Sequence, residues 1–136
     1  MSTQDNQLLQ DAARAAGWSW WRSKHGYWNI TTPSGSSTSC CHSWQKYDPD
    51  TGEKLPEPEP ADALIECGWN PLLDDGDALR LAVKLRIRIE QHPSWAYVAA
   101  FSYDLVGRFE EPIDSDPYAA IRRAIVVCAA AIGRGE

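Results

Sequence analysis

The chain has 136 residues, of which 43% are hydrophobic and 24% charged, as is typical of one ordinary globular domain. Its formal net charge is −6 and both halves are acidic, which disfavours duplex nucleic acid and anionic membranes as partners. No apolar run is long enough to span a bilayer, and the N-terminus lacks the apolar core of a secretory signal. Four cysteines lack the density of a disulfide scaffold, so we expect a cytoplasmic protein with reduced thiols.

The N-terminal quarter predicts a helix followed by a β-hairpin. Residues 4–16 carry small and apolar side chains at helical spacing, and Gly17 is placed to end the helix. Residues 18–22 and 27–32 are aromatic and β-branched, as expected of two strands. Gly26 lies between them and predicts the positive φ of a tight turn.

A polar segment rich in Pro, Ser and Glu follows the hairpin. Residues 33–39 predict a flexible loop, and residues 40–47 a possible third strand. Residues 48–61 alternate Pro with acidic side chains and predict an exposed, extended connector. We therefore expect one domain over residues 1–136, with a flexible insertion at 33–61.

Helical signals return after this insertion. Residues 62–67 predict a short helical turn, and residues 75–85 a helix with Asp74 as its N-cap and Asp77 completing a pair of the capping-box type. The predicted buried stripe of the longer helix consists of Leu79, Leu81, Ala82, Val83 and Leu85.

The C-terminal part predicts two strands and a long helix. Residues 86–91 alternate apolar and charged side chains, whereas residues 95–103 are apolar on both faces, as in a central strand covered from both sides. Residues 104–115 predict a loop. Asp116 caps the last helix, and Gly133 ends it.

This order of elements predicts an α+β protein. Helices on both faces of the doubly apolar strand give a three-layer α/β/α sandwich around a mainly antiparallel sheet of four to five strands.

Two stretches resemble a known family. WNPLLDDGDALRLAVKL at residues 69–85 and DPYAAIRRAIVVCAAAIG at residues 116–133 are similar to segments of the phage ABA sandwich family, small proteins encoded by tailed phages and prophages. The resemblance implies an α/β/α sandwich, a phage or prophage origin and a place in the cytoplasm of a bacterial host. It implies no catalytic residue and no ligand.

An acidic group offers oxygen ligands for Mg²⁺ or Ca²⁺: Asp74, Asp75 and Asp77, with Glu66 upstream. The spacing lacks the alternating ligands and distal Glu of an EF-hand loop. Capping of the helix that begins at residue 75 explains Asp74 and Asp77 without a metal, and we favour that interpretation.

Thiols and imidazoles form the other reactive group. Cys40, Cys41, His42 and Cys67 are enough donors for zinc, but no C-x₂-C pair is present and adjacent cysteines rarely bind the same ion. Cys41 paired with His42 or His25 would be a nucleophile and base, yet nothing in the sequence positions a third, orienting group. We predict no metal, no cofactor and no catalytic residue, and favour a non-enzymatic protein.

Seven tryptophans are unusual for this length, and five of them crowd the N-terminal strands: Trp18, Trp20, Trp21, Trp28 and Trp44. Trp20, Trp21, Trp28 and Trp44 are the candidate residues of an aromatic binding surface, because both faces of a Trp-rich hairpin are hard to cover. The alternative, which we favour for most of these side chains, is that they pack in the core.

These observations favour an accessory protein of a phage or prophage that binds a host or phage protein through the aromatic surface. Homodimerisation through the same surface is a variant. A second hypothesis is a small-molecule or nucleotide-binding protein, perhaps a hydrolase, using Asp74, Asp75 and His25. A third is a single-stranded nucleic-acid binder, for which the candidate basic residues are Lys84, Arg86 and Arg88.

Overall fold

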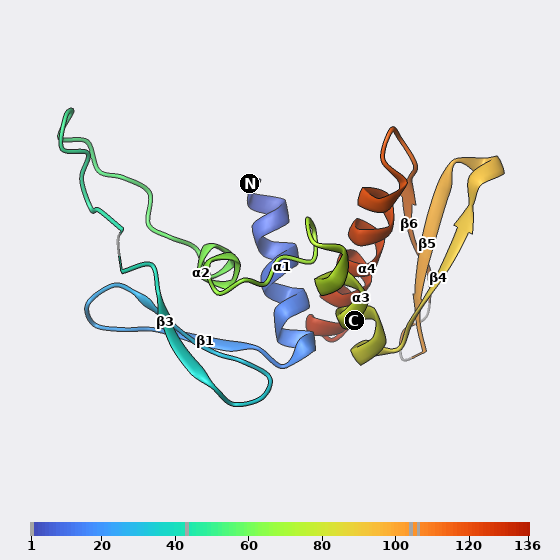
Figure 1. The fold of residues 1–136 in the computed structure, drawn as a ribbon, viewed down its shortest axis with the longest axis horizontal. Coiled ribbons are helices and arrows are strands. Elements are labelled where there is room, and N and C mark those ends of the chain that lie inside the picture. The colour runs from blue at the N-terminus through green and yellow to red at the C-terminus, as the bar shows by residue number, and fades with distance from the viewer. Residues whose placement is uncertain (1, 43, 104, 106) are drawn as a thin grey trace.

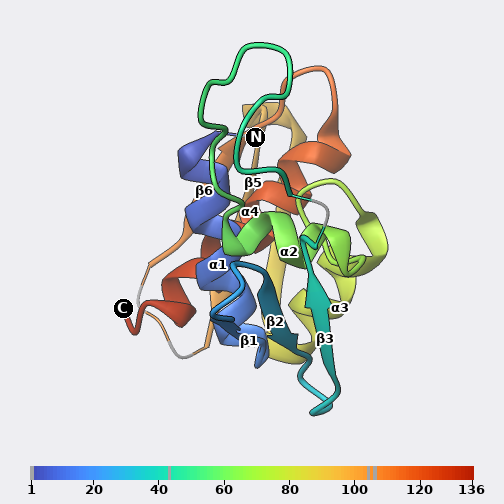
Figure 2. The ribbon, with the colours of Figure 1, turned by 90° about the vertical axis from the view of Figure 1, so that its left-hand side faces the viewer.

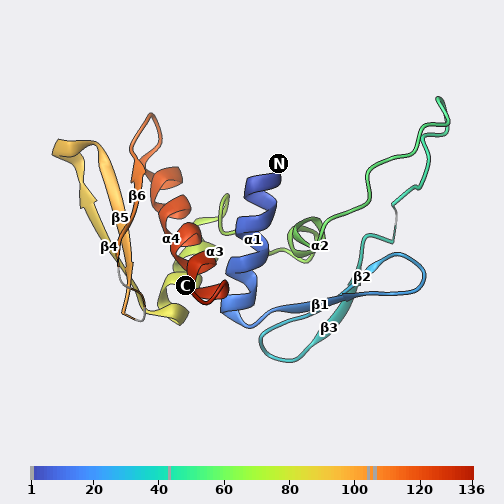
Figure 3. The ribbon, with the colours of Figure 1, turned by 180° about the vertical axis from the view of Figure 1, so that it is seen from behind.

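The structure is a computed structural model that describes residues 2–42, 44–103, 105 and 107–136. In this part of the chain four α-helices lie between two three-stranded antiparallel sheets, which confirms the α+β class (Figure 1). The strands do not form the expected single sheet of four to five strands. They divide into two sheets at opposite ends of the molecule, and the helices lie between these sheets rather than on both faces of one (Figure 3).

The centre of the molecule is a pair of packed helices, α1 (Thr3–Ala16) and α4 (Pro117–Gly133). Ser2 caps α1 and Asp116 caps α4, each accepting hydrogen bonds from backbone N–H groups of the first turn, and Gly17 ends α1 as predicted. Mostly small side chains are buried on these helices, which lets the backbones approach closely. They include Leu9, Ala12, Ala13, Ala124, Ala129 and Ala130.

The first sheet contains the predicted hairpin, β1 (Ser19–Arg22) and β2 (Trp28–Thr31), and a third strand, β3 (Ser37–Cys40) (Figure 2). The third strand that the sequence allowed is present, but at Ser37–Cys40 rather than over 40–47, so the loop expected over 33–39 is shorter than predicted. Gly35 closes a tight turn with a φ of 93°, so β3 begins at Ser37 and pairs in register with β2. A positive φ of 67° at Cys41 then ends the strand.

The acidic, Pro-rich segment connects this sheet to a short helix, α2 (Pro60–Glu66). Tyr47 and Lys54 form an isolated antiparallel bridge around a turn in the segment. The helix begins earlier than the expected turn at 62–67, because Pro60 fits a first helical position and the Asp62 carboxylate accepts a hydrogen bond from the Glu59 N–H at 2.8 Å.

The second sheet has the order β4–β5–β6, with β4 at Ile87–His92, β5 at Tyr97–Ser102 and β6 at Phe109–Pro112. The central place predicted for the doubly apolar strand is confirmed. The expected loop over 104–115 contains β6, and the expected start of the strand at Trp95 is instead the 3₁₀ turn Pro93–Trp95.

Helices cover only the inner face of the second sheet (Figures 1 and 3). On the outer face, the Arg88 and Arg108 guanidinium groups lie over the Phe101 ring, at 4.6 and 5.5 Å from its centroid. These long side chains shield the aromatic rings in place of the helix that the sequence led us to expect.

The remaining α-helix, α3 (Asp75–Leu85), lies beside α4 and β4. Asp74 is its N-cap and accepts a hydrogen bond from the Asp77 N–H at 2.7 Å, as predicted. The predicted buried stripe is only partly correct. Leu81 and Ala82 are buried, whereas Leu79 and Val83 are 64% and 71% exposed.

Candidate functional site

The four candidate tryptophans of the sequence analysis do not form one exposed surface. Trp20 and Trp28 pack partly buried against the core, on the inner face of the first sheet. The indole N–H of Trp28 donates to the Pro58 carbonyl at 3.0 Å, and that of Trp44 donates to the Pro56 carbonyl at 2.8 Å. Trp21 points to the opposite face and is 60% exposed.

Trp28 therefore attaches the Pro-rich segment to the first sheet, whereas Trp44 joins two parts of the connecting segment to each other. The Arg22 guanidinium adds an ion pair to Glu57 at 2.6 Å. A groove of about 330 Å³ remains beside Trp44, lined also by Cys41 and Glu66.

The cysteine side chains near this groove are poor nucleophiles. Burial and, after it, the neighbouring Cys67 raise the pKa of the Cys40 thiol to about 12. Burial and then the Glu66 carboxylate do the same to Cys41, whose pKa is also about 12. Both thiols are thus protonated near neutral pH, the opposite of what nucleophilic catalysis needs.

The imidazole rings of the two candidate histidines, His25 and His42, pack against the ring of Tyr27 rather than next to a cysteine thiol. His25 stacks on Tyr27 with ring centroids 6.3 Å apart, and His42 also packs against the Tyr27 ring, at 4.3 Å. Within the described residues no hydrogen bond joins Cys41 to either histidine. The expected catalytic pair is therefore not assembled.

The candidate carboxylates are engaged by groups of the chain itself. Asp74 caps α3, and Asp77 accepts from the Asn70 N–H at 2.9 Å and from Arg80 at 2.7 Å. Asp75 forms an ion pair with Arg122 at 2.6 Å. Among the described residues, no group of three or more His, Cys, Asp or Glu side chains is placed to hold a metal ion.

The candidate basic residues are dispersed. Lys84 lies in the last turn of α3, and Arg86 ends that helix with a positive φ of 55°. Arg88 lies on the outer face of β4, 3.5 Å from the Glu90 carboxylate. Alternating charges, rather than a basic groove, therefore characterise this strand.

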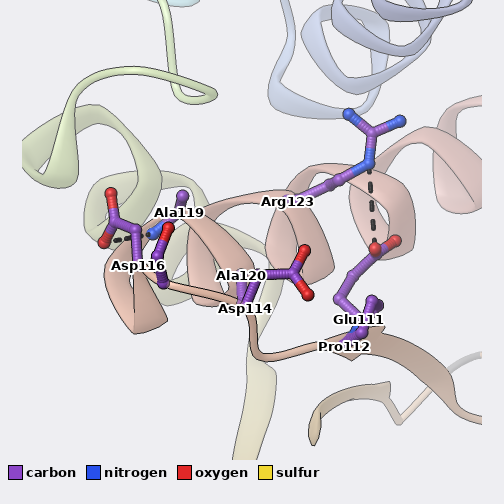
Figure 4. A pocket seen from close by; sticks show the side chains of 8 residues that line it. Glu111, Pro112, Asp114, Asp116, Ala119, Ala120 and Arg123 are labelled. Atoms are coloured by element: carbon purple, nitrogen blue, oxygen red, sulfur yellow. Dashed lines mark hydrogen bonds and ion pairs between the residues drawn. The ribbon is translucent and has the colours of Figure 1, made fainter.

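A pocket of about 420 Å³ lies between β6 and the start of α4 (Figure 4). Glu111 and Arg123 face each other across it at 3.8 Å, and Asp114 and Asp116 contribute further carboxylates. Burial raises the pKa of Glu111, and the Arg123 charge opposes this shift. The volume suits a small ligand, and the excess of carboxylates suits a cationic one. The sequence did not indicate this pocket, because residues 104–115 predict a loop and the strand β6 that forms one of its walls was not expected.

A second hollow region runs between α3, β4 and α4. Two adjoining grooves of about 390 and 380 Å³ share Leu79, Ala82 and Ile89 in their walls. Four large side chains on their margins are exposed, each by more than half: Leu79, Val83, Tyr103 and Tyr118. Exposed apolar side chains that gather around a groove are typical of a binding surface.

The same region borders an open strand. In the order β4–β5–β6, only one edge of β4 is paired, so its other edge presents free backbone N–H and C=O groups among the strands that the structure describes. We call this outer edge of β4, together with Leu79, Val83, Ile89, Tyr103 and Tyr118, the β4 edge surface.

Comparisons of the chain with protein-family models, curated proteins and solved structures found no match. No helix in the described part of the chain has the length and apolar character needed to cross a membrane.

Proposed function

We propose that the protein is a non-enzymatic protein-interaction module and that the β4 edge surface is its binding surface. The observation that carries the proposal is the exposure of Leu79, Val83, Tyr103 and Tyr118 beside an unpaired strand edge. An edge strand binds another chain through its backbone groups, and apolar side chains beside it add affinity when they are covered.

The free energy of association that the exposed apolar side chains can contribute supports the choice of the β4 edge surface. Leu79 and Val83 lie one helical turn apart on α3 and expose most of their side chains. Complete burial of each would contribute about 1.5–3 kcal/mol to association. Trp21, the exposed member of the original aromatic set, lies on the other sheet among polar neighbours such as Asn29 and Ser39.

The proposed setting is a phage or prophage accessory role in the cytoplasm of a bacterial host. It rests on the resemblance of residues 69–85 and 116–133 to the phage ABA sandwich family. The first of these stretches contains Leu79 and Val83, and the second contains Tyr118.

A variant pair tests the surface. We expect the tagged wild-type protein to elute from gel filtration of a bacterial lysate at a size larger than the monomer. Replacing both Leu79→Gln and Val83→Gln removes the apolar contact while keeping good helix formers, so we expect at least about tenfold weaker association. The monomer size would then dominate the elution profile.

Trp21→Gln is the matched control, because it removes an exposed apolar side chain on the distant sheet. It should leave the elution position unchanged. Loss of the larger species in the Trp21→Gln variant alone would move the binding surface to the first sheet. A wild type that elutes only as a monomer would refute the proposed function.

A further inference from the structure

We propose that the partner at the β4 edge surface is a second copy of this chain, joined by antiparallel pairing of β4 with its own counterpart. The inference rests on the proposed function and names its partner. A two-fold axis perpendicular to the sheet, passing midway between Ile89 and its counterpart, would convert the two three-stranded sheets into one continuous six-stranded sheet. The helices of both copies would lie on the same side of this six-stranded sheet.

Charge complementarity selects this register. Arg88 and Glu90, the sequence neighbours of Ile89, both lie on the outer face of β4. With Ile89 opposite its own counterpart, Arg88 of each copy lies opposite Glu90 of the other, and the pair occurs twice. Cross-strand pairs of opposite charge stabilise a sheet, and like charges directly opposite each other destabilise it.

Neighbouring registers that keep the helices on one side lack this match. An axis midway between the two Arg88 residues places two guanidinium groups opposite each other, and an axis midway between the two Glu90 residues places two carboxylates opposite each other. The strand is therefore self-complementary in one register only among these three.

The apolar residues favour the same arrangement. Ile89 lies on the inner face of the sheet, in the wall shared by both grooves. Among the strands of the second sheet, α3 packs mainly on β4. The axis beside β4 would therefore bring α3 close to its counterpart. Leu79 and Val83, which are largely exposed in the monomer, would then face the partner's α3.

A charge-exchange experiment tests the register. Sedimentation equilibrium of the purified wild type should show a monomer–dimer equilibrium. Arg88→Glu alone places carboxylates opposite carboxylates, and Glu90→Arg alone places guanidinium groups opposite one another. We expect each single variant to dimerise at least about tenfold more weakly than the wild type.

Two combinations should restore association. An equimolar mixture of the Arg88→Glu and Glu90→Arg variants puts unlike charges opposite each other at both positions, so a heterodimer should form. The double variant carrying both changes should form a homodimer again. The mixture also controls for folding, since it contains the same chains that fail to associate alone, and circular dichroism checks each variant.

The outcomes separate this inference from the proposed function. If the purified wild type stays monomeric while the lysate complex still depends on Leu79 and Val83, the self-pairing is refuted and the interaction module stands. If neither sample associates, both fail. Single variants that dimerise as tightly as the wild type, or a mixture that gains nothing, would overturn the Ile89-centred pairing.

Discussion

Gly133→Ala should lower the free energy of unfolding by about 3 kcal/mol or more, the upper range for overpacking a core. Gly133 is the last residue of α4, where this helix crosses α1. A Cβ atom added there would overlap the backbone carbonyl of Asp11. Backbone atoms on a packed helix cannot move aside as a side chain can, so the two helices would have to separate.

Gly76→Ala provides the matched control in α3. Its added Cβ would lie 3.2 Å from the guanidinium nitrogens of Arg80 and from a carboxylate oxygen of Asp74, which are the ends of side chains. The end of Arg80 can move aside, and the capping carboxylate of Asp74 must give by only a few tenths of an ångström. Ala also favours a helix over Gly by up to about 1 kcal/mol. Urea denaturation followed by circular dichroism measures both variants. Equal stability changes in the two would show that the α1–α4 crossing is looser than described.

Leu64→Ala should lower the free energy of unfolding by about 2–5 kcal/mol. Leu64 is fully buried in α2, the short helix that contacts both α1 and β2. Truncation would remove apolar contacts and leave a cavity where the first sheet joins the helical centre. Tryptophan fluorescence, to which Trp20, Trp21 and Trp28 of the first sheet contribute, and circular dichroism both measure the loss.

Leu73→Ala is the control for this prediction, since the same substitution is made at a side chain that is 74% exposed. We expect a change within about 0.5 kcal/mol. A Leu64→Ala variant as stable as the Leu73→Ala variant would contradict the role of α2 in holding the first sheet.

The helices were predictable because their ends carry strong local signals. Asp74 and Asp116 are N-caps, Gly17 is a C-cap, and each acts on backbone groups only a few residues away. The hairpin was predictable for the same reason, since its turn contains Gly26 with a φ of 92°.

The two short strands β3 and β6 were not predictable from their residues. β3 reads Ser-Thr-Ser-Cys and β6 reads Phe-Glu-Glu-Pro, which lack the β-branched and aromatic pattern of a buried strand. Their pairing with β2 and β5 provides the backbone hydrogen bonds that define them. The sequence placed a possible third strand at 40–47 instead of 37–40 and a loop where β6 lies, and it suggested one sheet where the chain forms two.

The candidate site was missed for a different physical reason. The spacing of Leu79 and Val83 is that of a buried helical stripe, and spacing alone does not say which side of a helix is covered. The tryptophans were misleading in the opposite way, because they suggested an exposed binding surface where Trp28 and Trp44 are partly buried. The hydrogen bonds from Trp28 and Trp44 go to Pro58 and Pro56, distant partners that only the folded chain brings close.

Amide hydrogen exchange across a concentration series tests the central claim most directly, namely that β4 presents an open edge that another chain occupies. In dilute wild-type protein, amides on the outer edge of Ile87–His92 should exchange rapidly. We expect them to become protected as the concentration rises, while the opposite edge strand, Phe109–Pro112, does not change. Equal exchange of the two edge strands at every concentration would contradict the pairing of β4 with a second copy.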